Sequence, residues 1–103
     1  MILTALDNKI STQAIDWRIN RLLSRKWSRD EAELALRQVL NCIDLTTLEG
    51  TDTPSKIQDL CFRAQKPSLK LNLSSTAAVC VYPNMVSIAR EALGLKSNVK
   101  IAA

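Results

Sequence analysis

From residue 42 to the end of the chain, short apolar runs alternate with longer segments of helical periodicity. The apolar runs lie at 42–46, 77–81 and 99–103, and Thr53-Pro54 and Gly94 punctuate the segments between them. A capping residue followed by proline starts a helix, and a glycine commonly ends one. Strands that alternate with helices form βαβ units, in which the strands are parallel and the crossovers right-handed. The alternation therefore predicts an α/β fold with three parallel strands and two connecting helices.

Two amphipathic helices are predicted in front of this run. Apolar residues recur every three or four positions over residues 12–25, which is the spacing of one helix face. Ser28-Arg29-Asp30-Glu31 is a capping box, and the helix that it opens runs to about residue 40. We therefore divide the chain into a helical leader, residues 1–40, and a βαβαβ part, residues 41–103.

Composition limits the class of protein. The 103 residues are 47% hydrophobic with charges of both signs, which indicates one globular domain or less. The net charge of +4 is modest, and the basic residues cluster only between Arg18 and Arg29. That cluster is interpreted as a solvated helix face, and nucleic-acid binding is the weaker alternative. No apolar run approaches the roughly 18 residues of a membrane span, so a cytoplasmic protein without a membrane or nucleic-acid partner is predicted.

The three cysteines have no paired spacing, and the chain contains no histidine. This pattern argues against a zinc site or a disulfide framework and favours a reducing compartment. Cys42 and Cys61 are interpreted as core residues, and Trp17 and Trp27 as apolar anchors of the leader helices. The run at 77–81 is almost wholly apolar, which is typical of a strand covered on both faces.

Polar side chains interrupt the first apolar run. Asp44 and Thr46 are two positions apart, so in a strand they point to the same side, and Ala78, Cys80 and Tyr82 share one face of the second strand. A buried aspartate is costly unless it is paired or hydrogen-bonded. Two interpretations of Asp44 remain open: a structural carboxylate paired with a lysine of a neighbouring strand, or a functional group.

The two strand motifs resemble a known family. Ile43-Asp44-Leu45-Thr46-Thr47-Leu48 and the later Thr76-Ala77-Ala78-Val79-Cys80-Val81-Tyr82-Pro83 closely resemble the first two barrel strands of deoxyribose-phosphate aldolase. Leu60-Cys61 and Ala64, which lie between them, also look like that family. The resemblance covers roughly residues 38–103 and is loose before them.

The resemblance implies a (β/α)₈ barrel. Such aldolases cleave 2-deoxy-D-ribose 5-phosphate to D-glyceraldehyde 3-phosphate and acetaldehyde through a lysine Schiff base, without metal or cofactor. The chemistry of these barrels lies at the C-terminal ends of the strands. The resemblance implies that Asp44 takes part in the proton relay around the reactive lysine, that Thr46 holds a substrate hydroxyl, and that Cys80 and Tyr82 line the pocket. From the residues alone, an inert Cys80 and a packing role for Tyr82 are the simpler interpretations.

The family's Schiff-base lysine lies on a later strand. The lysines of this chain are predicted on helices, in loops or at a strand start, where an ammonium stays protonated. They are Lys9, Lys26, Lys56, Lys66, Lys70, Lys96 and Lys100.

A complete barrel takes about 250 residues, so we expect the N-terminal part of a longer aldolase, inactive alone. Its partners are then a phosphorylated sugar in the complete enzyme and, for its open edges, the remaining strands or a second copy. The alternative is a non-catalytic, self-associating α/β interaction module.

Overall fold

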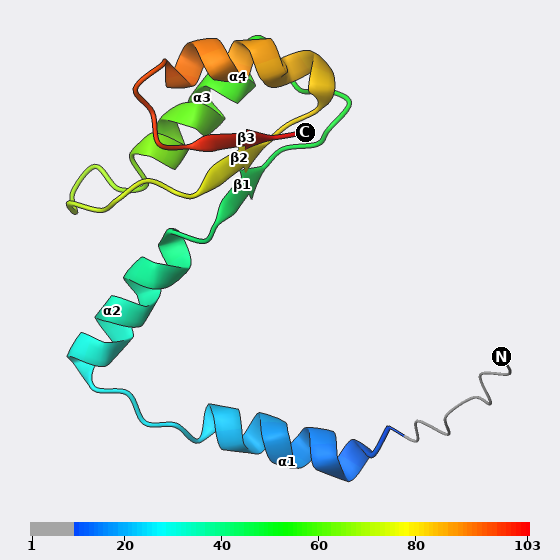
Figure 1. Ribbon diagram of the computed structural model, residues 1–103, viewed down its shortest axis with the longest axis vertical. Coiled ribbons are helices and arrows are strands. Elements are labelled where there is room, and N and C mark those ends of the chain that lie inside the picture. The colour runs from blue at the N-terminus through cyan, green and yellow to red at the C-terminus, as the bar shows by residue number, and fades with distance from the viewer. Residues whose placement is uncertain (1–9) are drawn as a thin grey trace, which may run out of the picture.

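Three short parallel strands lie side by side in the computed structural model, which describes residues 10–103 (Figure 1). They are β1 (Asp44–Thr46), β2 (Ala78–Cys80) and β3 (Lys100–Ala102), adjacent in chain order. The predicted α/β class with a parallel sheet is confirmed. Each strand is shorter than the apolar run that predicted it.

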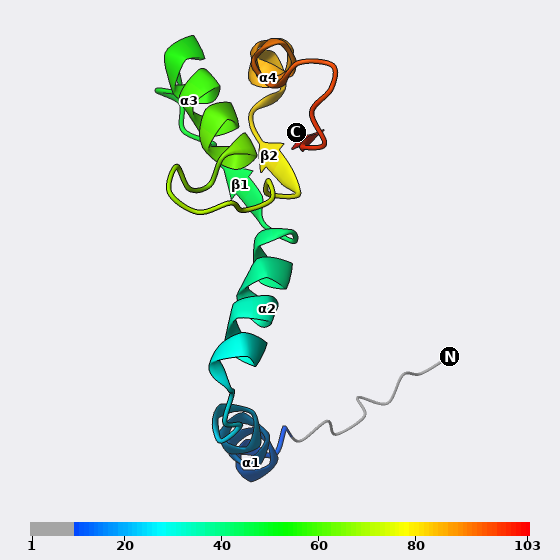
Figure 2. The same cartoon turned by 90° about the vertical axis from the view of Figure 1, so that its left-hand side faces the viewer.

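Two helices cover one face of this sheet. The helices are α3 (Pro54–Gln65) and α4 (Val86–Leu93), and the 3₁₀ turn η1 (Pro83–Met85) leads into α4. Both helices lie on the same side of the strands (Figure 2), as right-handed crossovers between neighbouring parallel strands require. The buried apolar side chains lie between the helices and the sheet. They are Ile57, Leu60, Cys61, Ala64, Val79, Val81, Ala89, Leu93 and Val99.

The opposite face of the sheet is open. Val79 is fully buried toward the helices, whereas Ala78 and Cys80 on either side of it are only half-buried. The run is typical of a strand covered on both faces, whereas within the described residues only the helix side of β2 is covered. An apolar run did not distinguish the two cases, because alanine and cysteine are small enough to occupy either a covered or an open face.

The leader forms its two predicted helices, α1 (Thr12–Leu23) and α2 (Arg29–Leu40). The capping box is confirmed: the Glu31 N–H donates to Ser28 Oγ, and the Ser28 N–H donates to Glu31 Oε2. Both helices extend away from the sheet (Figure 1), and neither contains a buried residue. The radius of gyration is 19.8 Å, compared with about 13 Å for a compact domain of this length.

The two tryptophans do not act as anchors in this arrangement. Trp17 is 63% exposed, and Trp27 is also exposed. The Arg21 and Arg25 guanidinium groups lie 5.4 Å and 3.9 Å from their respective ring centroids, which is cation–π geometry. The predicted anchoring role is wrong for the described residues, because no other element reaches these rings.

Cysteine burial was predicted correctly at one position and wrongly at another. Cys61 lies on the buried side of α3 and is fully buried, and desolvation by burial raises the pKa of its thiol. Cys42 is exposed in the turn after α2, where its N–H donates to the Val39 carbonyl oxygen. The apolar run that contains Cys42 therefore begins as a turn and becomes a strand only at Asp44.

Gly94 ends α4, as predicted, with φ +75° and ψ 170°. The positive φ is confirmed, but the extended ψ differs from the left-handed helical value expected of a simple C-cap. This region of backbone conformation is accessible almost only to glycine. It turns the chain from α4 back toward β3. The helices within residues 10–103 are all too short or too polar to cross a bilayer.

Candidate functional site

The open face of the sheet carries two rows of side chains. Across the three strands Asp44 pairs with Ala78, which pairs with Lys100, and Thr46 pairs with Cys80, which pairs with Ala102. These residues alternate with Leu45, Val79 and Ile101, which pack toward the helices. The alternation therefore gathers Asp44, Thr46 and Cys80 on one face.

Asp44 is exposed on this face. The prediction of a buried aspartate is wrong for the described residues, because nothing within them covers the open side of β1. The Thr46 hydroxyl donates to the Asp44 carbonyl oxygen at 3.2 Å. Since the strands are parallel, Thr46 and Cys80 lie one row nearer the C-terminal ends of the strands than Asp44.

Tyr82 lies at the C-terminal edge of the sheet. The Val81 N–H donates to the Ala102 carbonyl oxygen at 3.1 Å, so the pairing of β2 with β3 continues to this edge. Tyr82 follows with an extended backbone and an exposed side chain, directly before Pro83 begins η1. The substrate roles of Thr46, Cys80 and Tyr82 and the relay role of Asp44 remain predictions.

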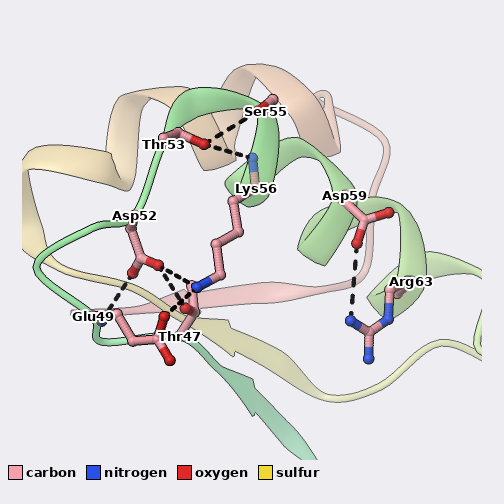
Figure 3. A network of polar contacts seen from close by, with 8 residues as sticks. All are labelled: Thr47, Glu49, Asp52, Thr53, Ser55, Lys56, Asp59 and Arg63. Atoms are coloured by element: carbon pink, nitrogen blue, oxygen red, sulfur yellow. Dashed lines mark hydrogen bonds and ion pairs between the residues drawn. The ribbon is translucent and has the colours of Figure 1, made fainter.

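A polar network that the sequence interpretation missed lies at the end of β1 (Figure 3). The Thr47 hydroxyl donates to Asp52 Oδ1 at 2.8 Å, and the Glu49 N–H donates to Asp52 Oδ2 at 3.1 Å. Lys56 Nζ lies 3.0 Å from Asp52 Oδ1 and also pairs with Glu49. The Asp52 side chain is only 2% exposed. This carboxylate therefore holds the loop between β1 and α3 in place.

The network shifts the pKa values of Asp52 and Lys56 in opposite directions. Desolvation by burial raises the pKa of Asp52, but the hydrogen bonds from Lys56, Thr47 and the Glu49 N–H outweigh it, and the net pKa is lowered. Hydrogen bonds to Glu49 and Asp52 raise the pKa of Lys56. The Lys56 ammonium is thus held protonated, and it is a poor candidate for an amine nucleophile.

We expect the chain to lose stability in acid through Asp52. Because the pKa is lower in the folded state, the stabilisation is complete above the ordinary pKa of 3.8 and is lost as the pH falls through the folded value. Urea unfolding measured from pH 7 to pH 2 should show this decline. Asp52→Asn should lower stability at neutral pH and flatten the decline.

Two other acidic residues affect how this experiment is interpreted. The stability of Asp52→Asn should still fall in acid to some extent because of Glu31, whose pKa is lowered by hydrogen bonds with the Ser28 backbone and side chain. Asp59 is exposed, and within residues 10–103 its only ion pair is the 3.8 Å contact with Arg63, so Asp59→Asn makes the same chemical change without removing a buried contact. If the stability of Asp52→Asn fell with pH in parallel with that of the parent chain, the Asp52 carboxylate would not be the ionised, hydrogen-bonded group described here.

Within residues 10–103, the cysteine, aspartate and glutamate side chains form no group of three that could hold a metal ion. The fold and the polar face together define an α/β protein whose candidate site lies on a parallel sheet. No protein-family model matches the chain.

The deoxyribose-phosphate aldolase of Bos taurus is 39% identical over 95 residues, which cover 82% of this chain and 30% of that aldolase. The chain is therefore a homologue of deoxyribose-phosphate aldolase, as the two strand motifs predicted. It spans about a third of the length of this curated relative. The relative that this chain matches is an aldolase, and aldolases are lyases.

Proposed function

We propose that this chain forms one wall of a deoxyribose-phosphate aldolase site, in which 2-deoxy-D-ribose 5-phosphate is cleaved reversibly to D-glyceraldehyde 3-phosphate and acetaldehyde. One observation carries the proposal: Asp44, Thr46 and Cys80 lie together on the sheet face that α3 and α4 leave open. In a (β/α)₈ barrel the helices cover the outside, so this face is the inside. The barrel, the division into residues 1–40 and 41–103, and a cytoplasmic location belong to the same proposal.

Each site residue has a role in this proposal. The Asp44 carboxylate relays protons near a Schiff-base lysine, and the Thr46 hydroxyl, one row nearer the strand ends, holds a substrate hydroxyl. Cys80 and Tyr82 line the pocket. The reaction uses no metal or cofactor. A Schiff-base lysine must be neutral when it attacks, and Lys56 is held protonated by Glu49 and Asp52. Because the resemblance also implies that the Schiff-base lysine lies on a later strand, we assign it to sequence outside this chain.

The site is completed by further strands. The chain spans 30% of the aldolase that it matches, and the inner face bearing Asp44 is exposed to solvent. We propose that the remaining barrel strands cover this face and that the chain alone is inactive. Their cover would also place Asp44 in the low-dielectric surroundings in which a relay carboxylate can be tuned.

Reductive trapping tests this assignment. A chimera is made in which this chain replaces its matching segment in the Bos taurus aldolase. Acetaldehyde and borohydride convert a Schiff-base lysine to ethyl-lysine, which peptide mass spectrometry locates. We expect a labelled lysine in the aldolase-derived part of the chimera and none in the 103-residue chain by itself. Specific labelling of a lysine within these 103 residues would overturn the assignment.

A second candidate function is a non-catalytic, self-associating interaction module. It is favoured by an apolar groove between α2 and the segment 71–73, where the Arg37 guanidinium donates to the Asn72 carbonyl oxygen at 3.2 Å. The apolar residues that line the groove are Ala32, Leu36, Val39, Leu40, Ile43, Leu71 and Leu73. A monodisperse, cooperatively melting dimer of the chain, together with a folded chimera that traps no lysine, would favour this function.

A further inference from the structure

Lys100 lies on the open face in the same row as Asp44. The register pairs Asp44 with Ala78 and Ala78 with Lys100, so one residue of β2 separates the two charged groups. Both are exposed, and they are the only charged residues in the two rows of the open face between 44 and 102. From the sequence, Lys100 was expected only at a strand start with a solvated ammonium.

The spacing of the strands allows these two side chains to meet. Neighbouring strands lie about 4.8 Å apart, which separates the Cα atoms of Asp44 and Lys100 by about 10 Å. An extended lysine reaches about 6 Å from its Cα, and an aspartate about 3 Å. Ala78 places only a methyl group between them. The ammonium can therefore cross β2 to within ion-pair distance of the carboxylate.

We propose that Lys100 pairs with Asp44 across Ala78 and is a positioning residue of the aldolase site. The role in the site rests on the proposed function, whereas the pair itself does not. A carboxylate on the inner face of a closed barrel is costly without a partner, and Lys100 supplies the opposite charge from the same sheet. The pairing turns the Asp44 carboxylate along the sheet toward β3 and holds the Lys100 ammonium over Ala78. Lys100 therefore orients Asp44 and is not the amine that attacks substrate.

Carbodiimide cross-linking tests the pair in the 103-residue chain. The reagent activates the Asp44 carboxylate, the Lys100 amine attacks the acyl carbon, an amide bond forms, and the reagent leaves as its urea, so the protein loses one water. The Lys56–Glu49 pair is the internal positive control. We expect a 44–100 linkage in peptide maps, with a yield similar to that of the control and at least about tenfold above any 44–96 linkage.

Two variants make the cross-link specific. Lys100→Arg keeps the positive charge but cannot form the amide, so the linkage should disappear while the Lys56–Glu49 linkage remains. Lys96→Arg, in the exposed loop after α4, should leave the 44–100 linkage unchanged. A parent chain that forms the Lys56–Glu49 linkage but no 44–100 linkage would overturn the pair.

A spectroscopic measurement tests positioning. We expect the ¹³C resonance of the Asp44 carboxyl carbon to shift in Lys100→Met and to return toward its parent position in Lys100→Arg, because the arginine restores the charge. An Asp44 resonance indifferent to both substitutions would refute positioning by charge. These measurements do not require catalysis: a cross-linked pair beside a chimera that traps no lysine would refute the aldolase proposal and leave the pair standing.

Discussion

Replacing Asp44 with asparagine in the chimera with the Bos taurus aldolase is expected to lower kcat by about 10²–10⁴-fold, the usual contribution of a positioned proton-transfer group. Asparagine keeps the size of the side chain but cannot exchange a proton. Because Asp44 lies on the face of the sheet opposite the helix-covered core and asparagine has almost the same volume, the substitution should leave the α/β part folded. Steady-state cleavage of 2-deoxy-D-ribose 5-phosphate measures the effect.

Asp59→Asn is the matched control for this substitution. It makes the same chemical change on α3, where the side chain is exposed and its only ion pair, within residues 10–103, is the 3.8 Å contact with Arg63. Turnover should be unchanged. If Asp44→Asn retained the turnover of the parent chimera, Asp44 would have no part in proton transfer.

The second large effect is expected in the core of the isolated chain. Leu60 lies on the buried side of α3 and is 6% exposed. It belongs to the apolar cluster that α3 forms with α4 and the sheet. Leu60→Ala should lower the free energy of unfolding by about 2–5 kcal/mol, because it removes buried methyl groups and leaves a cavity. That is a large fraction of the stability of a small domain, which is about 5–15 kcal/mol. Urea unfolding monitored by circular dichroism measures the loss.

Leu95→Ala removes the same atoms from a side chain that is 99% exposed. Its effect should stay within about 0.5 kcal/mol. Equal losses in the two variants would mean that α3 and α4 do not cover the sheet as described.

Local signals in the sequence predicted where helices begin and end. The Thr53 cap with Pro54, the stop at Gly94 and the capping box at Ser28 all act within one turn of the backbone, so each can be recognised without knowing the fold. Burial is different, because it depends on which elements meet. Trp17 was placed in apolar contacts and Asp44 among buried groups, yet the described residues leave both exposed.

The candidate site also combines features that follow from the local sequence with features that depend on how the elements meet. The shared face of Asp44 and Thr46 follows from the two-residue period of a strand and could be predicted. The bond from Thr47 to Asp52 and the burial of that carboxylate could not, because they depend on how the loop after β1 folds back toward α3. The alignment of Lys100 with Asp44 depends on the register of two successive strand pairs, which hydrophobic pattern alone does not determine.

The most direct test of the account is turnover by the unsubstituted chimera. If the open face of this sheet is the inner wall of an aldolase, a chimera that melts cooperatively should release acetaldehyde from 2-deoxy-D-ribose 5-phosphate, whereas the 103-residue chain alone should release none. A cooperatively folded chimera that releases no acetaldehyde under conditions in which the Bos taurus aldolase is active would contradict the account.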